Sequence, residues 1–347
     1  MKPWEFWDAR IFYAPLAIYI LWLMLRHRRG IGCITKADAS FPYGGLSIGS
    51  KYAILERFKQ SPLFDSHFAK SFLVRASWRV NTRVRRASAF INKHLSFPVI
   101  LKPDYGHRGN GVLLVQNMAE LRDTLARMTI DHILQAYHDE PYEFGVFYIR
   151  LPGEQRGRIW SITEKVLPTV TGDGVHTLRQ LIEAEPRYVH RKEKLFEKNR
   201  AALDTILKKG EQRKLLITGS HAQGAIFLEG KQYKTRRLER VIETISRADP
   251  AFHFGRYDMK AKSIAAFKRG AFRIVELNGV DSESTNIYDP QYSLIEAYRI
   301  LFAQWRLLFA IATRISGPYP SLWELITNYR HFFSATKETV APRAAYQ

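Results

Sequence analysis

The sequence predicts a mixed α/β fold, and two observations lead to this prediction. Short runs rich in β-branched and aromatic residues alternate with helical patterns along most of the chain. With 347 residues and a hydrophobic content of 46%, the chain is long enough for two domains and can bury packed cores. This composition excludes a disordered tail protein. The single cysteine, Cys33, excludes a disulfide scaffold and a cysteine-based zinc cluster.

The chain begins with a candidate membrane segment. Residues 11–25 form an unbroken apolar run, and a basic cluster at 26–29 follows it, whereas a secretory signal peptide has its cations first. The run is shorter than the ~20 residues that cross a bilayer, but a helix starting at Trp4, with Trp4 and Trp7 in the interface, would be long enough. We predict a membrane-associated helix over residues 1–30, single-pass or monotopic, on the cytoplasmic side of the inner or plasma membrane. The alternative is a buried hydrophobic helix.

The elements that follow are predicted from local periodicity. Helices are expected over 51–60, 118–128 and 234–248, with a highly charged helical region over 176–209. Strands are expected over 71–76, 97–103, 111–116, 132–137, 144–150, 161–167, 255–261 and 272–278, with a further apolar segment at 214–219. Residues 75–93 carry six cations and no acidic residue, which indicates either a solvated helical face or a basic patch facing phosphate or membrane.

A second amphipathic segment lies near the C-terminus. Residues 294–314 predict a helix on which Arg299, Arg306 and Arg314 share one face. Such a helix either packs on a domain core or lies in a lipid interface, and both alternatives stay open. Residues 318–347 predict a packed helix followed by an irregular tail.

The first segment with a chemical signature is a strand that delivers a lysine into a glycine-rich turn. Lys102 ends the strand at 97–103, and Gly106, Gly109 and Gly111 follow before the next strand. Glycines let backbone N–H groups approach phosphates, and a lysine neutralises their charge. No G-K-[ST] sequence opens a helix here, so this is not a Walker motif.

The second such segment places acids beside an arginine. Glu276 and Asn278 are two residues apart on one predicted strand and therefore share a face. Arg256 and Asp258 have the same relation on another strand. The oxygens of Asp258, Glu276 and Asn278 are ligands that suit Mg²⁺, and Arg256 could reach a phosphoryl group beside that ion. Ordinary surface charge is the alternative for each residue taken alone.

Taken together and in this order, four segments resemble the ATP-grasp superfamily, with the closest likeness to amino-acid and dipeptide ligases such as D-alanine–D-alanine ligase. They are FPVILKPDYGHRGNGV, ILQAYHDEPYEFGVFYIR, FGRYDMKA and FRIVELNGVDSESTNIYDP. Residues 170–182 also resemble a segment of cyanophycin synthetase-like ligases. The resemblance covers roughly residues 50–290 and implies two α+β subdomains that clasp ATP. We accordingly expect a hydrophobic helix at 1–30, a reduced N-terminal region at 31–96, the ATP-grasp domain at 97–290 and a helical region at 291–347.

The resemblance also implies roles for individual residues. It implies that Asp258, Glu276 and Asn278 bind magnesium, with two Mg²⁺ expected and Mn²⁺ as a substitute, and that Arg256 and Lys165 act at the transferring phosphoryl group. Glu143 would bind the ribose. The remaining ATP contacts implied are Lys51, Lys102, Gly106, Arg108, Gly109 and Gly111 for the phosphates, and Gln135, Ala136 and Tyr137 for the adenine.

The implied reaction is ATP-dependent ligation of a carboxylate and an amine through an acylphosphate, with amino acids or peptides as substrates. A kinase on the same fold and a catalytically silent membrane scaffold are the alternatives. Only about twenty residues separate the basic cluster at 26–29 from Lys51, so the usual N-terminal domain is reduced, and a membrane-associated acceptor is a reasonable hypothesis. The formal net charge of +20 predicts an anionic partner. Because no nucleic-acid-binding motif is found, we expect an anionic membrane surface and no nucleic acid.

Overall fold

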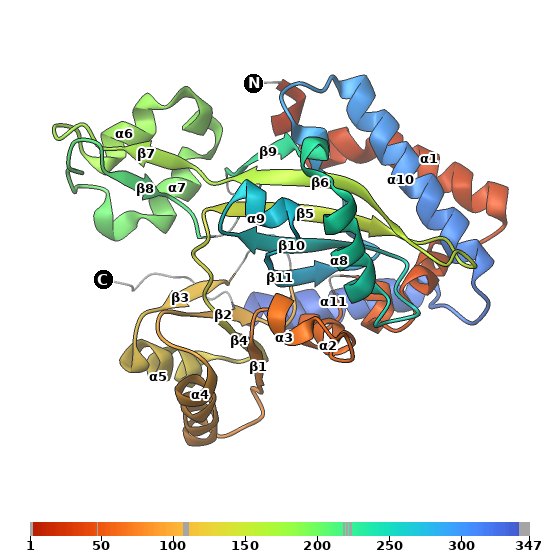
Figure 1. Ribbon diagram of the computed structural model, residues 1–347, viewed down its shortest axis with the longest axis horizontal. Helices are drawn as coiled ribbons and strands as arrows, with labels where there is room; N and C mark the ends of the chain where they lie inside the picture. The colour runs from red at the N-terminus through yellow and green to blue at the C-terminus, as the bar shows by residue number, and fades with distance from the viewer. Residues whose placement is uncertain are drawn as a thin grey trace.

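The structure, a computed structural model, describes residues 3–46, 48–106, 111–217, 219, 221 and 224–339 (Figure 1). It confirms the mixed α/β class. Its strands form a four-stranded sheet in the order β1-β4-β2-β3, a five-stranded sheet in the order β11-β10-β5-β6-β9 and a two-stranded sheet of β7 and β8. Neighbouring strands in all three sheets run antiparallel.

The four-stranded sheet has two helices on one face and its own apolar core. Leu101, Leu121 and Leu134 are fully buried there. The basic segment at 75–93 contributes one of the two helices. Its Arg83 is buried and donates to the carbonyls of Leu125 and Met128. The other arginines of this segment are exposed, namely Arg75, Arg79, Arg85 and Arg86. The elements are β1 (Ser71–Val74), α4 (Val80–His94), β2 (Val99–Pro103), β3 (Leu113–Val115), α5 (Met118–Arg127) and β4 (His132–Ala136).

The five-stranded sheet separates two cores, because alternate residues of each strand point to opposite faces. Phe144 and Tyr148 pack under helices α8 and α9 on one face, whereas Phe147 and Ile149 pack against α10 on the other. The elements are β5 (Tyr142–Ile149), β6 (Arg158–Val166), β9 (Ile226–Glu229), α8 (Arg236–Ser246), β10 (Phe254–Ala261), α9 (Ile264–Lys268), β11 (Arg273–Asn278) and α10 (Leu294–Arg314).

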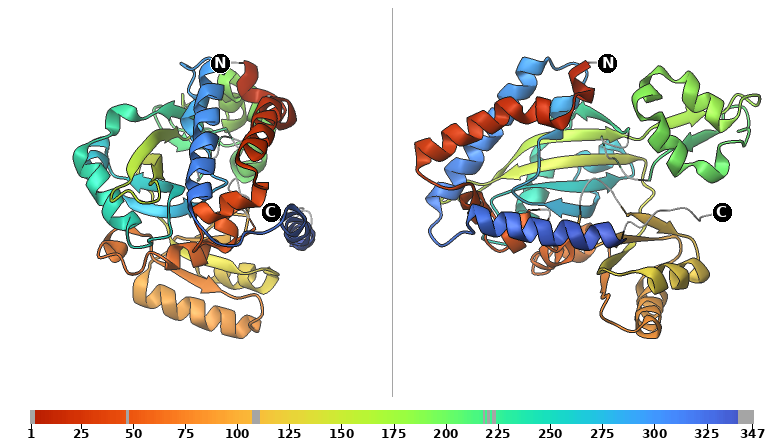
Figure 2. Two further views of the ribbon diagram at one scale, coloured as in Figure 1. Left: turned by 90° about the vertical axis from the view of Figure 1, so that its right-hand side faces the viewer. Right: turned by 180° about the vertical axis from the view of Figure 1, so that it is seen from behind.

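Residues 167–217 form a separate lobe with its own core, visible at one end of the molecule in Figure 2. The helical region predicted over 176–209 is present as short helices and 3-10 turns and not as one long helix. Pro186 interrupts it, since proline lacks an amide hydrogen and disfavours helix in the residue before it. The lobe instead contains β7 (Thr169–Thr171), α6 (Leu178–Ala184), α7 (Lys192–Lys198), β8 (Gln212–Lys214) and the 3-10 turns Pro186–Arg191 and Arg200–Ala202. The short strands β7 and β9 had no signal in the sequence analysis.

The apolar N-terminal segment forms helix α1 (Ala9–His27), which lies beside α10 in both views of Figure 2. Phe12, Leu16 and Leu23 are buried between them, while the opposite side of α1 is exposed. Among the described residues, α1 is the one helix that is long and apolar enough to cross a membrane. Helix α10 packs on the core through Leu301, Leu308 and Phe309, so its three arginines form a solvated stripe, as the first alternative predicts.

Three further helices complete the fold. Helix α2 (Lys51–Glu56) begins at the N-cap Ser50, and α3 (Phe64–His67) follows it. The predicted helix in 318–347 is α11 (Leu322–Thr339). Short 3-10 turns occupy Pro3–Phe6, Ile31–Ala37, Pro42–Gly45, Lys231–Tyr233 and Thr285–Tyr288.

Candidate active site

A cavity of about 610 Å³ lies between the four-stranded and five-stranded sheets. Its walls come from β2, β4, β5, β6, β10 and β11, from the loop after β11, and from the N-terminal segment before and within α1. Of the predicted site residues, the cavity contacts Lys51, Lys102, Gly106, Gln135, Ala136, Tyr137, Glu143, Lys165, Arg256, Asp258, Glu276 and Asn278. Arg108 and Gly109 lie outside the described residues.

Lys102 connects the two sheets at the floor of this cavity. Its Nζ atom donates to Gln135 Oε1 and to the carbonyl of Val275, both at 3.0 Å. Gln135 Nε2 also donates to the Val275 carbonyl, at 3.2 Å. Burial lowers the pKa of Lys102 to about 8, although Glu276 opposes the shift. A buried lysine held between two sheets in this way is positioned to meet an anion.

Two hydrogen bonds join the loop after Lys102 to the start of α2. The Asp104 side chain accepts from the amide of Tyr52 at 2.7 Å, and the Asp104 carbonyl accepts from the amide of Lys51 at 3.0 Å. These bonds fix the N-terminus of α2, from which Lys51 Nζ pairs with Glu276 Oε1 at 2.6 Å. Gly106 has a φ of +116°, a conformation that favours glycine. The role of Asp104 was not predicted.

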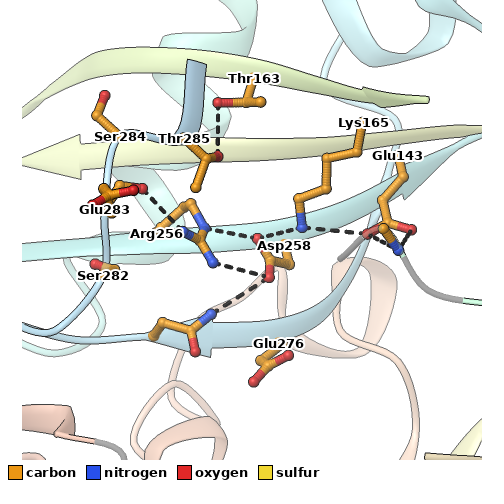
Figure 3. Close-up of polar contacts among 12 residues, drawn as sticks. Glu143, Thr163, Lys165, Arg256, Asp258, Glu276, Ser282, Glu283, Ser284 and Thr285 are labelled. Carbon is orange, nitrogen blue, oxygen red and sulfur yellow. Dashed lines mark hydrogen bonds and ion pairs between the residues drawn. The ribbon is translucent and has the colours of Figure 1, made fainter. Parts of the chain in front are cut away.

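Glu143 and Lys165 lie opposite each other on paired strands β5 and β6. Lys165 Nζ is 3.3 Å from Glu143 Oε1 and 2.9 Å from Asp258 Oδ1, so it bridges two carboxylates (Figure 3). Glu143 also accepts from the amide of Gly219 at 3.2 Å. Lys260 on β10, which was not predicted, lies 4.0 Å from Glu143 Oε2 and adds a further cation.

The register of β10 and β11 brings the predicted acidic cluster together. Asp258 pairs with Glu276, and Arg256 pairs with Asn278. Arg256 Nε donates to Asp258 Oδ1 at 3.0 Å (Figure 3). Asn278 Nδ2 lies 3.5 Å from Asp258 Oδ2. The spacing of two within each strand put the side chains on one face, and the antiparallel pairing made them neighbours.

The acids of this cluster carry a negative charge at neutral pH. Burial alone would raise the pKa of Asp258, but Arg256 and Lys165 outweigh it and hold the pKa below its usual range. Burial would also raise the pKa of Glu276, but Lys51 and Lys102 outweigh burial and lower this pKa. Two ionised carboxylates and an amide oxygen are a donor set that fits a hard cation such as Mg²⁺. The described residues contain no group of three or more His, Cys, Asp or Glu that could hold a metal, so a metal at Asp258 and Glu276 would need Asn278 as a third ligand.

Several cavity residues were missed in the sequence analysis. Glu283 and Tyr288 lie in the loop after β11, His221 lies in the connection before β9, and Glu5 and Tyr13 lie near the N-terminus. His221 Nε2 is 3.0 Å from Glu5 Oε1, although the two residues are 216 positions apart. No local pattern could have found such a pair. Glu283 lies in one of the four segments that resemble the ATP-grasp superfamily, but the sequence did not identify it as a site residue.

Comparison with known proteins identifies a family that matches part of the chain. Residues 68–150 match the RimK-like ATP-grasp domain family. Over these residues the chain is similar to that family. The matched ATP-grasp segment runs from the approach to β1 to the end of β5, and it contains Lys102, Gln135 and Glu143. The residues of β10 and β11 lie outside it.

The solved structures that are similar to this chain are distant from it. They include VanG D-Ala:D-Ser ligase from Enterococcus faecalis, with 14% identity, a TM-score of 0.40 and coverage of 74% of this chain and 61% of that one. D-alanine–D-alanine ligase from Bacillus anthracis has 13% identity, a TM-score of 0.42 and coverage of 76% and 67%. A bifunctional glutathione synthetase from Pasteurella multocida has 16% identity and a TM-score of 0.37; this chain covers 36% of it, and 73% of this chain is matched. No curated protein matches the sequence.

Proposed function

We propose that this protein is an ATP-dependent ligase that joins a carboxylate to an amine through an acylphosphate. The observation that carries the proposal is the composition of the cavity, beside a segment that matches the RimK-like ATP-grasp domain family. Lys51 pairs there with Glu276, Lys165 and Arg256 pair with Asp258, and Lys102 lines the same cavity. Four cations beside two ionised acids suit a polyphosphate held together with a metal ion.

In this proposal, ATP lies between the two sheets. Lys102 and Lys51 contact its phosphates, and the loop from Gly106 through Arg108 and Gly109 to Gly111 covers them. Gln135, Ala136 and Tyr137 line the adenine pocket. Glu143 binds the ribose hydroxyls. For this, Lys165 must leave Glu143 and contact a phosphate instead. The 3.3 Å separation of the Glu143–Lys165 pair makes that exchange a short movement of one lysine side chain.

Asp258, Glu276 and Asn278 would hold Mg²⁺, two ions being expected and Mn²⁺ a substitute, and the metal would neutralise charge on the phosphates. The protein's own groups do the remaining work. Lys51 and Lys165, which now pair with these carboxylates, are close enough to turn toward phosphate oxygens. Arg256 stays fixed by Asp258 and orients its guanidinium toward the transferring group.

The proposed reaction has two steps. First, a carboxylate oxygen attacks the γ-phosphorus of ATP, the bond to the β-phosphate oxygen breaks, and ADP leaves. Next, an amine attacks the acylphosphate carbon, the amide C–N bond forms, inorganic phosphate leaves, and the nitrogen loses a proton. Activation is needed because a carboxylate is a poor electrophile, and positioning with charge neutralisation suffices to catalyse both steps.

A screen for ADP release over amino acids and small peptides with Mg²⁺ tests this proposal. With a carboxylate substrate and hydroxylamine in place of the amine, we expect a hydroxamate whose mass identifies the carboxylate. A kinase on the same fold would instead release a stable phosphate ester and no hydroxamate. ADP release accompanied by the ester alone would favour the kinase, and no substrate-dependent ADP release would contradict both enzymes.

We also propose that the enzyme sits on the cytoplasmic face of a membrane through α1, in a monotopic arrangement. The exposed side of α1 carries Ile11, Ile18 and Leu25 at intervals of seven residues, with Leu21 and Trp22 between them. Ile18 is 70% exposed and Leu25 is 78% exposed. Arg26, Arg28 and Arg29 follow and suit anionic headgroups. Packing of the opposite side on α10 favours a helix in the plane of the interface over a spanning one, because a spanning helix would have to leave α10.

Flotation of the full chain with anionic phospholipid vesicles tests this attachment. We expect the double variant Ile18→Glu, Leu25→Glu to lower vesicle binding at least about tenfold, since each lost apolar contact is worth ~1.5–3 kcal/mol. Both side chains are exposed, so the fold should be unchanged. Ile206→Glu, at an apolar residue exposed in the lobe at 167–217, is the matched control. Equal binding by the double variant, or no binding by the unmodified protein, would refute the attachment.

A further inference from the structure

The N-terminal segment closes one end of the cavity with acids and aromatic rings. Trp4, Glu5, Trp7, Phe12 and Tyr13 all contact the cavity. They come from the turn at Pro3–Phe6, the residues that follow it and the first turns of α1. Acids distinguish this end of the cavity from the end that carries the lysines, and Arg191 also lines the cavity.

Glu5 supplies the first acid of this end and is only 9% exposed. Its Oε1 atom lies 3.0 Å from His221 Nε2. Its Oε2 atom is buried and has no hydrogen-bond partner among the described residues. A buried carboxylate oxygen without a donor is costly, so a donor on a bound molecule would stabilise this oxygen.

Glu283 supplies the second acid and is held in place from several sides. Its Oε2 atom accepts from Tyr13 Oη at 2.8 Å, and Tyr13 Oη is 3.0 Å from Tyr288 Oη. Gln304 on α10 fixes the backbone on both sides of Glu283, because it accepts from the amide of Ser284 and donates to the carbonyl of Ser282, each at 2.8 Å. Burial raises the pKa of Glu283, and the tyrosine hydroxyls oppose the shift.

Aromatic rings surround the two acids. The imidazole of His221 stacks on Tyr288 with ring centroids 4.2 Å apart, and Trp4 lies 6.3 Å from Tyr288. Trp4 also stacks on Phe12 at 5.7 Å. Carboxylates combined with aromatic faces recognise organic ammonium ions, since the carboxylate pairs with the charge and the ring faces attract it.

We propose that this acidic and aromatic end of the cavity binds the ammonium group of the amine substrate, an organic cation with an apolar body. The proposal rests on the ligase function, because it names the class of the second substrate. Arg256 joins the two ends of the cavity. Its Nε donates to Asp258, and its Nη1 donates to the carbonyl of Glu283 at 2.9 Å (Figure 3). An ammonium group bound at Glu5 and Glu283 therefore lies beside the group that faces the acylphosphate, and it must pass one proton to one of these carboxylates before its nitrogen can attack.

Calorimetric titration of the full chain with two probes of the same shape tests the subsite without requiring catalysis. Benzylammonium carries the charge and benzyl alcohol does not. We expect benzylammonium to bind at least about tenfold more tightly than the alcohol, and Glu283→Gln and Glu5→Gln each to remove most of that preference. The matched control is Glu164→Gln, because Glu164 also accepts a hydrogen bond from a tyrosine, Tyr233, at 2.6 Å but does not contact the cavity.

The outcomes separate this proposal from the ligase function. If the ligase is active, Glu283→Gln should raise the KM for its amine at least tenfold and leave the KM for ATP within about twofold. Equal affinity of the unmodified protein for both probes would overturn the subsite, even if amides are formed. Selective binding of benzylammonium by a protein that forms no amide would leave the subsite standing and reject the ligase. If Glu283→Gln does not fold, Glu5→Gln and Tyr13→Phe decide the question.

Discussion

Replacing Asp258 by Asn is expected to lower the rate of ATP turnover by a factor on the order of 10²–10³, the scale of losing one preorganised electrostatic group in an active site. Asp258 is the carboxylate around which the site is organised, since Lys165, Arg256 and Asn278 all contact it. The amide keeps the shape of the side chain and removes the charge that would hold a metal. Steady-state ADP release with saturating Mg²⁺ and ATP measures the effect.

The variant also leaves two buried cations, Lys165 and Arg256, without their shared carboxylate. We expect a lower thermal midpoint, because removing one partner of a buried ion pair typically costs ~3–5 kcal/mol. ADP release must therefore be compared at a temperature where circular dichroism shows both proteins folded. Asp123→Asn on α5 removes an exposed ion pair with Arg127 and should change neither turnover nor the midpoint appreciably. Retained turnover in Asp258→Asn would exclude Asp258 as a metal ligand.

Replacing Arg256 by Ala should produce a comparable or larger loss, about 10³-fold in kcat, which is the lower range for an arginine that stabilises phosphoryl transfer. The guanidinium is held between Asp258 and the Glu283 carbonyl, so its direction is fixed before substrates bind. We expect the Kd for ATP to change much less than kcat, because the contact strengthens as charge develops on the transferring group.

Two further variants define the cause of that loss. Arg256→Lys should recover only a small part of the rate, since it keeps the charge but cannot make both hydrogen bonds in the same plane. Arg127→Ala, from the exposed pair on α5, should leave kcat unchanged. If Arg256→Ala weakened ATP binding and left kcat at saturation intact, the residue would serve in binding and not in the transfer step.

Helices and strands that are specified by residues close together in the chain could be predicted from the sequence. Helix α10 occupies the predicted range 294–314, because Ser293 caps its first turn and apolar residues recur at helical spacing. The strands that carry the candidate site also lie within a few residues of the predicted ranges. The lobe at 167–217 was predicted poorly, because its short elements depend on one another for burial and have little periodicity of their own.

The candidate site was predictable to the extent that its residues are close in the sequence. The spacing of Glu276 and Asn278, and of Arg256 and Asp258, placed each pair on one face of a strand. Their union into one cluster depended on the pairing of β10 with β11, which a two-residue periodicity does not specify. The ion pairs of Lys51 with Glu276 and of Lys165 with Asp258 likewise required the assembled sheets.

The N-terminal segment shows most clearly which features follow from the sequence and which follow from the tertiary structure. Its apolar composition by itself determined that residues 9–27 would be a helix with an affinity for an apolar surface. Only the tertiary structure decided that one side of this helix packs on α10, that the other stays exposed, and that Glu5 and Tyr13 reach the cavity. The physical reason is that periodicity reports which residues of one segment share a face, whereas the partner of that face is chosen by packing between segments hundreds of residues apart.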